Sequence, residues 1–219
     1  MRIINQDNWP RKCAFQFFHQ YETPQFNICA DLVITDTYRL LQEAGIHKFT
    51  AFLWLVCKAA NSVEEIRYRL SGDQVLSYEV VHPSFTWLKE DKTLTFCLAH
   101  YNDEISQFFA NVRESVNQTE PDLVTADDQT PADVLYISCL PWINFRSISH
   151  PIKNDDSGAI PRITWGKFCQ SGTDWNMPVS LQMHHGLADG YHAGLFFERL
   201  QEMLNHPNSI NWQSVIPTD

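Results

Sequence analysis

The sequence predicts an α/β fold, a two-layer sandwich in which helices pack on a mixed β-sheet. Residues 26–34 alternate apolar and polar side chains, which is the period of a half-buried strand. Residues 104–117 place apolar side chains at helical spacing on one stripe. Many short strand-like runs, with a few helices between them, favour a sheet covered by helices. No repeat or linker divides the chain, so we expect a single domain over residues 1–219.

Helix signals surround the first long strand. Pro10 suits the first position of a helix, where its missing N–H leaves no hydrogen bond unmade. After the strand at 26–34, Asp36 is expected to cap a short helix that Gly45 ends. Residues 50–62 are apolar nearly all round, which predicts a buried helix.

Strand signals dominate the remainder of the chain. The expected strands cover residues 66–70, 75–78, 85–88, 93–100, 134–138, 143–148, 163–170 and 179–185. Residues 118–132 look like an exposed acidic loop. A final helix is expected over residues 191–204, and its inward-facing side chains are Leu195, Phe196, Leu200 and Leu204.

Composition excludes several classes of partner. The formal charge of −10 argues against nucleic acid, because phosphate binding needs clustered Lys and Arg. The longest apolar run, at 50–60, is too short to span a bilayer and is broken by Lys58. Residues 1–7 lack the apolar stretch of a secretory signal. We therefore expect a cytoplasmic protein with neither nucleic acid nor membrane as a partner.

The segment at 184–190 is the strongest chemical signal. His185 ends an apolar row of the expected strand 179–185 and precedes a turn that contains glycine. An imidazole at such a strand end can project into a cleft and accept a proton from a hydroxyl. On this pattern alone, a histidine packed in the core is the more common outcome.

A metal site is not expected at this segment. His184, His185, Asp189 and His192 are close in sequence, but adjacent strand residues point to opposite faces. They also lack the regular spacing of three metal ligands. The six cysteines are scattered, without a C-x-x-C pair.

Three stretches carry a resemblance to a known family. Residues 182–192, Gln-Met-His-His-Gly-Leu-Ala-Asp-Gly-Tyr-His, resemble the signature of chloramphenicol acetyltransferases. Residues 9–15 resemble the opening Trp-x-Arg segment of that family, and residues 137–145 resemble its Ser-x-x-Pro-Trp strand. Further matches occur in the family's order at Lys48-Phe49, Val81-His82-Pro83 and residues 163–167. The resemblance covers nearly the whole chain and implies the two-layer fold of that family.

The resemblance implies a direct acyl transfer. His185 would take the proton from the 3-hydroxyl of chloramphenicol, which then attacks the thioester carbonyl of acetyl-CoA. Ser138 would donate a hydrogen bond to the tetrahedral oxyanion. Asp189 would pair with Arg11 and hold the backbone of the site, and Thr164 would position an ordered water. From the residues alone, Ser138 remains open as an ordinary strand serine and Arg11–Asp189 as an exposed ion pair.

The resemblance also implies an assembly and an acceptor pocket. The assembly is a homotrimer with active sites between subunits, and coenzyme A enters through a tunnel opposite the acceptor. The pocket residues would be Phe17, Phe18, Phe96, Tyr136, His150 and Arg162. Trp142 is expected to pack in the core.

Several pocket positions depart from the family. Phe18 replaces a tyrosine, Tyr136 replaces an asparagine, and His150 and Arg162 stand where apolar residues are usual. Either the alignment is offset there or the acceptor differs, because an unpaired arginine is costly in an apolar pocket. The leading hypothesis is acetylation of chloramphenicol, which confers antibiotic resistance. The alternatives are transfer to another small alcohol and a non-catalytic binding module of the same fold.

Overall fold

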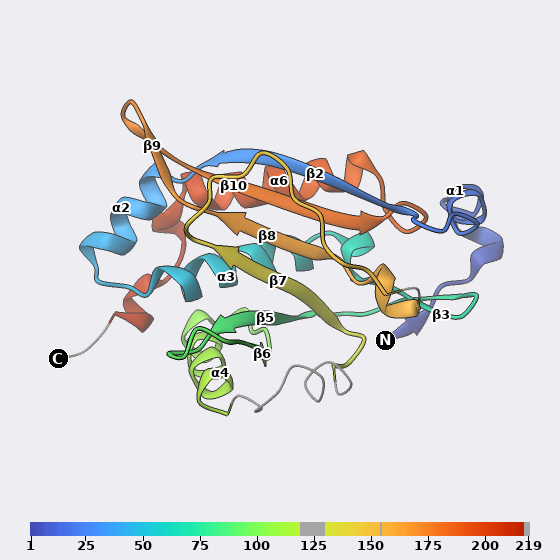
Figure 1. Cartoon of the computed structure of the whole chain (residues 1–219), viewed down its shortest axis with the longest axis horizontal. Helices are drawn as coiled ribbons and strands as arrows, with labels where there is room; N and C mark the ends of the chain where they lie inside the picture. The colour runs from blue at the N-terminus through green and yellow to red at the C-terminus, as the bar shows by residue number, and fades with distance from the viewer. Residues whose placement is uncertain (119–129, 154, 217–219) are drawn as a thin grey trace.

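A mixed β-sheet forms the centre of the protein (Figure 1). The structure is a computed structural model, and it describes residues 1–118, 130–153 and 155–216. The strands run in the order β2 (Gln25–Val33), β10 (Asp174–His184), β8 (Arg162–Gly166), β7 (Val134–Leu140), β5 (His82–Leu88) and β6 (Leu94–Leu98), and β9 (Cys169–Ser171) also pairs with β10. Strands β5, β7 and β8 are parallel to one another, whereas β2, β10, β9 and β6 join the sheet antiparallel.

Helices cover one face of this sheet. They are α2 (Thr35–Glu43), α3 (Lys48–Asn61), α4 (Ile105–Asn117) and α6 (Gly190–Asn205), and α3 and α6 lie behind the strands in Figure 1. Helix α3 is the most buried because apolar residues surround it, from Ala51 to Cys57 without a break. The prediction of an α/β fold with helices packed on a mixed sheet is therefore confirmed.

Smaller elements gather at the end of the sheet where α1 (Lys12–Phe18) lies. A second, three-stranded sheet joins β1 (Arg2–Ile3), β4 (Gln74–Ser77) and β3 (Tyr68–Ser71). The short 3₁₀ helices η1 (Gln6–Asn8), η2 (Glu64–Arg67) and η3 (Asp156–Ala159) belong to this group. Two others, η4 (Pro207–Ser209) and η5 (Trp212–Val215), contact α2, α6 and α4 instead. Among the described residues, no helix has the length and apolar character needed to cross a membrane.

The two faces of the sheet differ in chemistry. Towards the helices, strands β5, β7, β8 and β10 present apolar side chains to the core, among them Phe85, Ile137, Ile163, Val179 and Leu181. On the other face, cross-strand pairing aligns Ser138 with Thr164 and Thr164 with Ser180. A second row on that face contains Tyr136, Arg162, Gln182 and Asn27. The face away from the helices is therefore polar.

Residues 141–153 and 155–161, here called the strap, cross this polar face (Figure 1). The amide of Asn27 donates to the carbonyl of Ile148 (2.7 Å), and the hydroxyl of Thr164 lies 3.1 Å from Nε2 of His150. The strap explains why polar residues of the sheet, such as Gln182 and Ser180, are buried.

Some element predictions are wrong. Residues 143–148 are not a strand, because they belong to the strap. Ile66 lies in η2 rather than in a strand, and the strand expected over 163–170 is divided into β8 and β9 at Lys167 and Phe168. Much of the loop expected at 118–132 lies outside the described residues.

Two expectations about helices also need correction. Asp36 lies inside the first turn of α2, which begins at Thr35 with Ile34 at the capping position, so Asp36 does not cap it. Gly45 does follow this helix with a φ of 67°, a conformation that glycine adopts without strain. Of the inward-facing residues expected in the last helix, Leu195 is only partly buried, whereas Phe196, Leu200 and Leu204 are fully buried.

Candidate active site

His185 lies directly after β10, where the chain turns toward α6. Its main chain is held on both sides: its N–H donates to the carbonyl of Pro24 (2.8 Å), and its carbonyl accepts from Nη2 of Arg11 (3.2 Å). A backbone fixed at both polar groups gives the half-buried side chain a defined starting point.

Two aromatic rings hold the imidazole of His185. The ring of Phe18 stacks on it with centroids 3.9 Å apart and 5° between the planes, and Phe26 lies 4.6 Å away. Nδ1 of His185 is buried without a hydrogen-bond partner among the described residues. Because the packing fixes the ring, its position does not depend on a hydrogen bond to a carboxylate.

The turn after His185 depends on its neighbour. Nδ1 of His184 accepts the N–H of Gly186 (3.1 Å). Burial lowers the pKa of His184 to about 4, so this ring is neutral near pH 7. A Cβ at Gly186 would lie 3.0 Å from the His184 ring and 3.2 Å from Phe15, which explains a glycine at this close approach.

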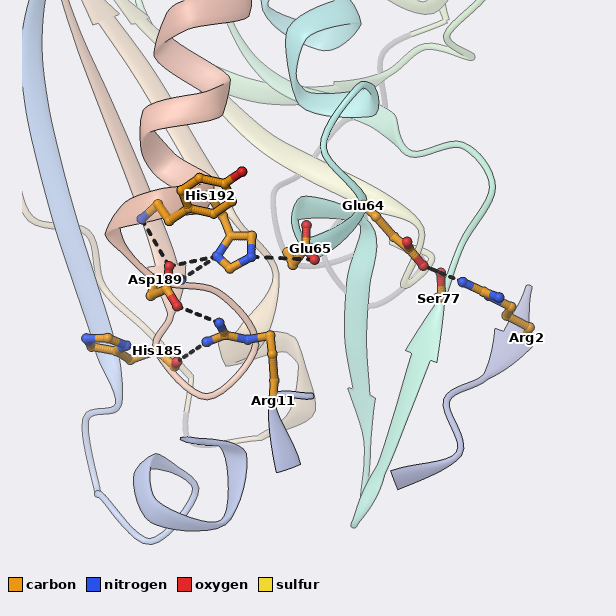
Figure 2. A network of polar contacts seen from close by, with 9 residues as sticks. Arg2, Arg11, Glu64, Glu65, Ser77, His185, Asp189 and His192 are labelled. Atoms are coloured by element: carbon orange, nitrogen blue, oxygen red, sulfur yellow. Dashed lines mark hydrogen bonds and ion pairs between the residues drawn. The ribbon is translucent and has the colours of Figure 1, made fainter. Parts of the chain in front are cut away.

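Arg11 and Asp189 form a short ion pair beside His185 (Figure 2). Nη1 of Arg11 lies 2.6 Å from Oδ2 of Asp189, and the two side chains are 12% and 37% exposed. Partial burial alone would raise the pKa of Asp189, but the Arg11 hydrogen bond and the nearby His192 and Arg11 lower it to about 2. Asp189 also caps α6 by accepting the N–H of Tyr191 (3.0 Å).

Ser138 lies in β7 on the polar face, and its hydroxyl is 3.5 Å from that of Thr86. The pairing of β7, β8 and β10 aligns Ser138 with Ser180, which precedes His185 by five residues. At about 3.3 Å per residue and about 4.8 Å per strand, His185 and Ser138 are more than roughly 15 Å apart in one chain. One chain therefore does not bring the two expected catalytic side chains together.

Some of the expected acceptor-pocket residues lie near Ser138, and others lie near His185. Tyr136, Arg162 and His150 lie on or above the polar face near Ser138, and Phe96 pairs with Thr86 on the same face. Phe18 lies instead against His185. Phe17 is 56% exposed, and its ring contacts Phe18 and Tyr21.

Arg162 is buried in a polar setting rather than at an apolar wall. Its Nη1 donates to the carbonyls of Ile160 (2.9 Å) and Gly158 (3.4 Å), and its guanidinium lies 5.2 Å from the ring centroid of Tyr136. Burial lowers the pKa of Arg162, and it forms no ion pair with a carboxylate among the described residues. Burial and the charge of Arg162 lower the pKa of His150, whose Nε2 meets the Thr164 hydroxyl.

A cavity of about 540 Å³ was not anticipated as a site. It opens at the carboxyl ends of β7 and β8, and the lining includes the aromatic side chains Tyr38, Phe49, Trp87, Trp142, Trp165, Phe168 and Trp175. Lys48 and Lys167 also line it. The expectation that Trp142 packs in the core is wrong, since this side chain is 64% exposed at the cavity. The sequence feature that could have predicted this exposure is the position of Trp142 at the end of a strand, next to a proline.

The described residues contain no group of three or more His, Cys, Asp or Glu side chains that could hold a metal ion. The side chains of His184 and His185 have different contacts. His184 accepts a hydrogen bond within its own turn, and His185 packs on Phe18. The chemical groups that these residues offer are an imidazole, a hydroxyl and an ion pair.

Comparison with known proteins identifies the family of this chain. The family described as chloramphenicol acetyltransferase matches residues 1–201. Chloramphenicol acetyltransferase 3 of Escherichia coli is 30% identical over 200 residues, covering 90% of this chain and 94% of that protein. A chloramphenicol acetyltransferase of Staphylococcus aureus is 30% identical over 208 residues, covering 94% and 96%.

A solved structure described as chloramphenicol acetyltransferase superimposes with a TM-score of 0.84 at 25% identity, covering 93% of this chain and 99% of that one. The sequence match, the order of motifs and the shared sheet all extend over nearly the full length. The chain belongs to the chloramphenicol acetyltransferase family.

Proposed function

We propose that this protein transfers the acetyl group of acetyl-CoA to the 3-hydroxyl of chloramphenicol, with His185 as the general base. The observation that carries the proposal is the His185 ring, stacked on Phe18 at 3.9 Å above a main chain anchored by Arg11. A half-buried imidazole held in this way can accept the hydroxyl proton as the oxygen attacks the thioester carbon. The proton then passes to the departing thiolate of coenzyme A.

Ser138 stabilises the oxyanion in this proposal. Its hydroxyl is half-buried in the polar row with Thr164, and its 3.5 Å contact with Thr86 is too long to hold it strongly. The hydroxyl can therefore turn toward an oxygen that gains negative charge during attack. Thr164 belongs to the same row, and its hydroxyl is 3.1 Å from His150, a contact compatible with orienting a water.

In the proposed homotrimer, His185 and Ser138 of different subunits together form the active site. The separation of His185 from Ser138 along and across the sheet supports an active site formed between subunits. In such a ring, His185 of one subunit faces the polar row of the next, which a heterologous, closed interface allows. Three identical sites result.

The cavity at the ends of β7 and β8 is the proposed tunnel for coenzyme A. Its volume of about 540 Å³ and its aromatic lining suit an adenine ring and a pantetheine arm. Lys48 and Lys167 provide positive charge for the phosphates. Thr86 and Cys139 also line the cavity, so it extends toward Ser138.

Release of free thiol tests the proposal. Purified protein with acetyl-CoA and chloramphenicol should release coenzyme A in proportion to acetylated drug, and His185→Ala should abolish the release. An unchanged rate in His185→Ala would remove the base from the mechanism. If the wild type releases thiol with other alcohols only, the acceptor is wrong while the chemistry stands.

A second candidate acceptor is a more polar alcohol. The observation that favours it is Arg162, a buried guanidinium bonded to carbonyls in the strap beside Tyr136 and His150. A polar face of this kind binds hydrogen-bonding groups better than an apolar ring. A panel of hydroxyl acceptors, compared by kcat/KM with chloramphenicol, decides between the two.

A further inference from the structure

The Arg11–Asp189 pair continues into a longer network (Figure 2). Oδ2 of Asp189 faces Arg11, and Oδ1 lies 2.8 Å from Nδ1 of His192. His192 is 9% exposed, and its Nε2 lies 3.5 Å from Oε1 of Glu65. The described contacts thus connect Glu65 to the carbonyl of His185 through three intervening side chains.

Each carboxyl oxygen of Asp189 has a separate task. One oxygen holds Arg11, whose second nitrogen holds the His185 carbonyl. The other oxygen caps α6 at Tyr191 and meets the His192 ring. The rotamer of Asp189 is therefore set from the His192 side as well as from the Arg11 side.

His192 lies between two carboxylates and faces both. Nδ1 of His192 accepts the main-chain N–H of Asp189 (3.2 Å) and lies 2.8 Å from Oδ1 of the same residue, whereas Nε2 lies 3.5 Å from Oε1 of Glu65. The negative charge of Glu65 holds the Nε2 edge of the ring, on the side away from Asp189. Loss of this charge would loosen the ring and, through it, the carboxylate of Asp189.

Glu65 is supplied by a well-anchored element. It lies in η2, where Ile66 is fully buried and Arg67 donates to the carbonyls of Tyr78 (2.7 Å) and Glu79 (2.8 Å). The Glu65 side chain is itself only 23% exposed. The neighbouring Glu64 pairs instead with Arg2, outside the network.

We propose that Glu65 and His192 are positioning residues for acyl transfer, which hold Asp189 against Arg11 and thereby fix the His185 main chain. The proposal rests on the proposed role of His185 as the base. Neither residue needs to contact a substrate. Their loss should therefore lower kcat and leave the KM for acetyl-CoA nearly unchanged.

The test is a double-mutant cycle on the full-length protein. We expect Glu65→Gln to lower kcat roughly 10-fold, because a small shift of a catalytic group has a large effect on rate. In an Asp189→Asn background, the same substitution should have almost no further effect, since the path to His185 is already broken. A 10-fold loss in both backgrounds would overturn the proposal, as would an unchanged kcat in Glu65→Gln.

Glu64→Gln is the matched control. It removes the same charge from the same turn, but its contacts are to Arg2, Ser77 and Tyr68, outside the network. We expect wild-type kcat from this variant, and a loss equal to that of Glu65→Gln would show a general charge effect and overturn the proposal. Melting temperatures identify any variant that unfolds, and His192→Gln, which keeps hydrogen-bonding groups, then replaces Glu65→Gln in the cycle.

A spectroscopic readout separates this proposal from the proposed function. In protein with isotope-labelled histidine, Glu65→Gln should shift the His185 imidazole signals and Glu64→Gln should not. If the wild type transfers acetyl to no alcohol but the His185 signals respond, the proposed function fails and the network stands. Unshifted signals in Glu65→Gln overturn the network whatever the activity.

Discussion

Ser138 shows how one hydroxyl can be tested apart from the fold. It is half-buried, and among the described residues its hydroxyl makes only a long contact with Thr86, so its removal disturbs little packing. We predict that Ser138→Ala lowers kcat about 100-fold or more, because one oxyanion donor is lost. The KM for acetyl-CoA should change little, and steady-state thiol release measures both constants. A kcat within twofold of wild type would remove Ser138 from the mechanism.

A substitution at Gly186 tests the turn that follows His185. A methyl group there would lie 3.0 Å from the His184 ring and 3.2 Å from Phe15, closer than ordinary contacts. We predict that Gly186→Ala lowers the melting temperature and the activity together, because overpacking shifts the backbone next to His185. Gly194→Ala, in α6 with open space around it, is the control and should keep the activity and raise the melting temperature slightly, because alanine favours a helix more than glycine does. Calorimetry and the thiol assay report the two effects.

The stabilisation that Asp189 provides should be lost at low pH. Its folded-state pKa of about 2 is below the unfolded value of about 3.9, so its stabilisation is present above pH ~4 and declines as pH falls toward 2. We predict that Asp189→Asn is less stable than wild type at pH 6 and that the difference shrinks between pH 4 and pH 2. Urea unfolding at several pH values measures this. A difference independent of pH would contradict the charged pair.

At the scale of elements, the carboxyl ends of β7 and β8 create the cavity. Both strands end there, and Lys48 at the start of α3 and Lys167 after β8 line the same space. We predict that Lys48→Ala and Lys167→Ala each raise the KM for acetyl-CoA several-fold while leaving the KM for the acceptor unchanged, because they bind phosphate charge. Lys89→Ala, outside this lining, is the control in the thiol assay.

The elements also show where sequence patterns succeed. Residues 26–34 alternate strictly, and the structure has β2 at Gln25–Val33 with its apolar row packed on the core. Residues 143–148 have a similar apolar pattern, but they form part of the strap and not of the sheet. The main chain of Ile143 bonds there to Lys167, and no neighbouring sequence can reveal that partner.

At the scale of the whole molecule, the proposed site requires more than one chain. If His185 of one subunit acts on the polar row of the next, a mixture of two inactive variants should regain activity. We predict that co-refolded His185→Ala and Ser138→Ala chains recover about a quarter of wild-type activity at equal amounts, because that share of interfaces is intact. Either variant refolded alone should stay inactive. No recovery in mixed trimers would place both groups in one subunit, and a monomer in sedimentation would contradict the assembly.

The sequence by itself determined the sheet-and-helix pattern, the residues around His185 and the resemblance that connects them to Ser138, Arg11 and Asp189. Short-range periodicity encodes these features, and the motifs are contiguous. Only the tertiary structure decided that His192 and Glu65 extend the Arg11–Asp189 pair, that Trp142 lines a cavity, and that the strap covers a polar face. The physical reason is that each of these contacts joins residues far apart in the chain, where burial and charge pairing depend on how the layers pack.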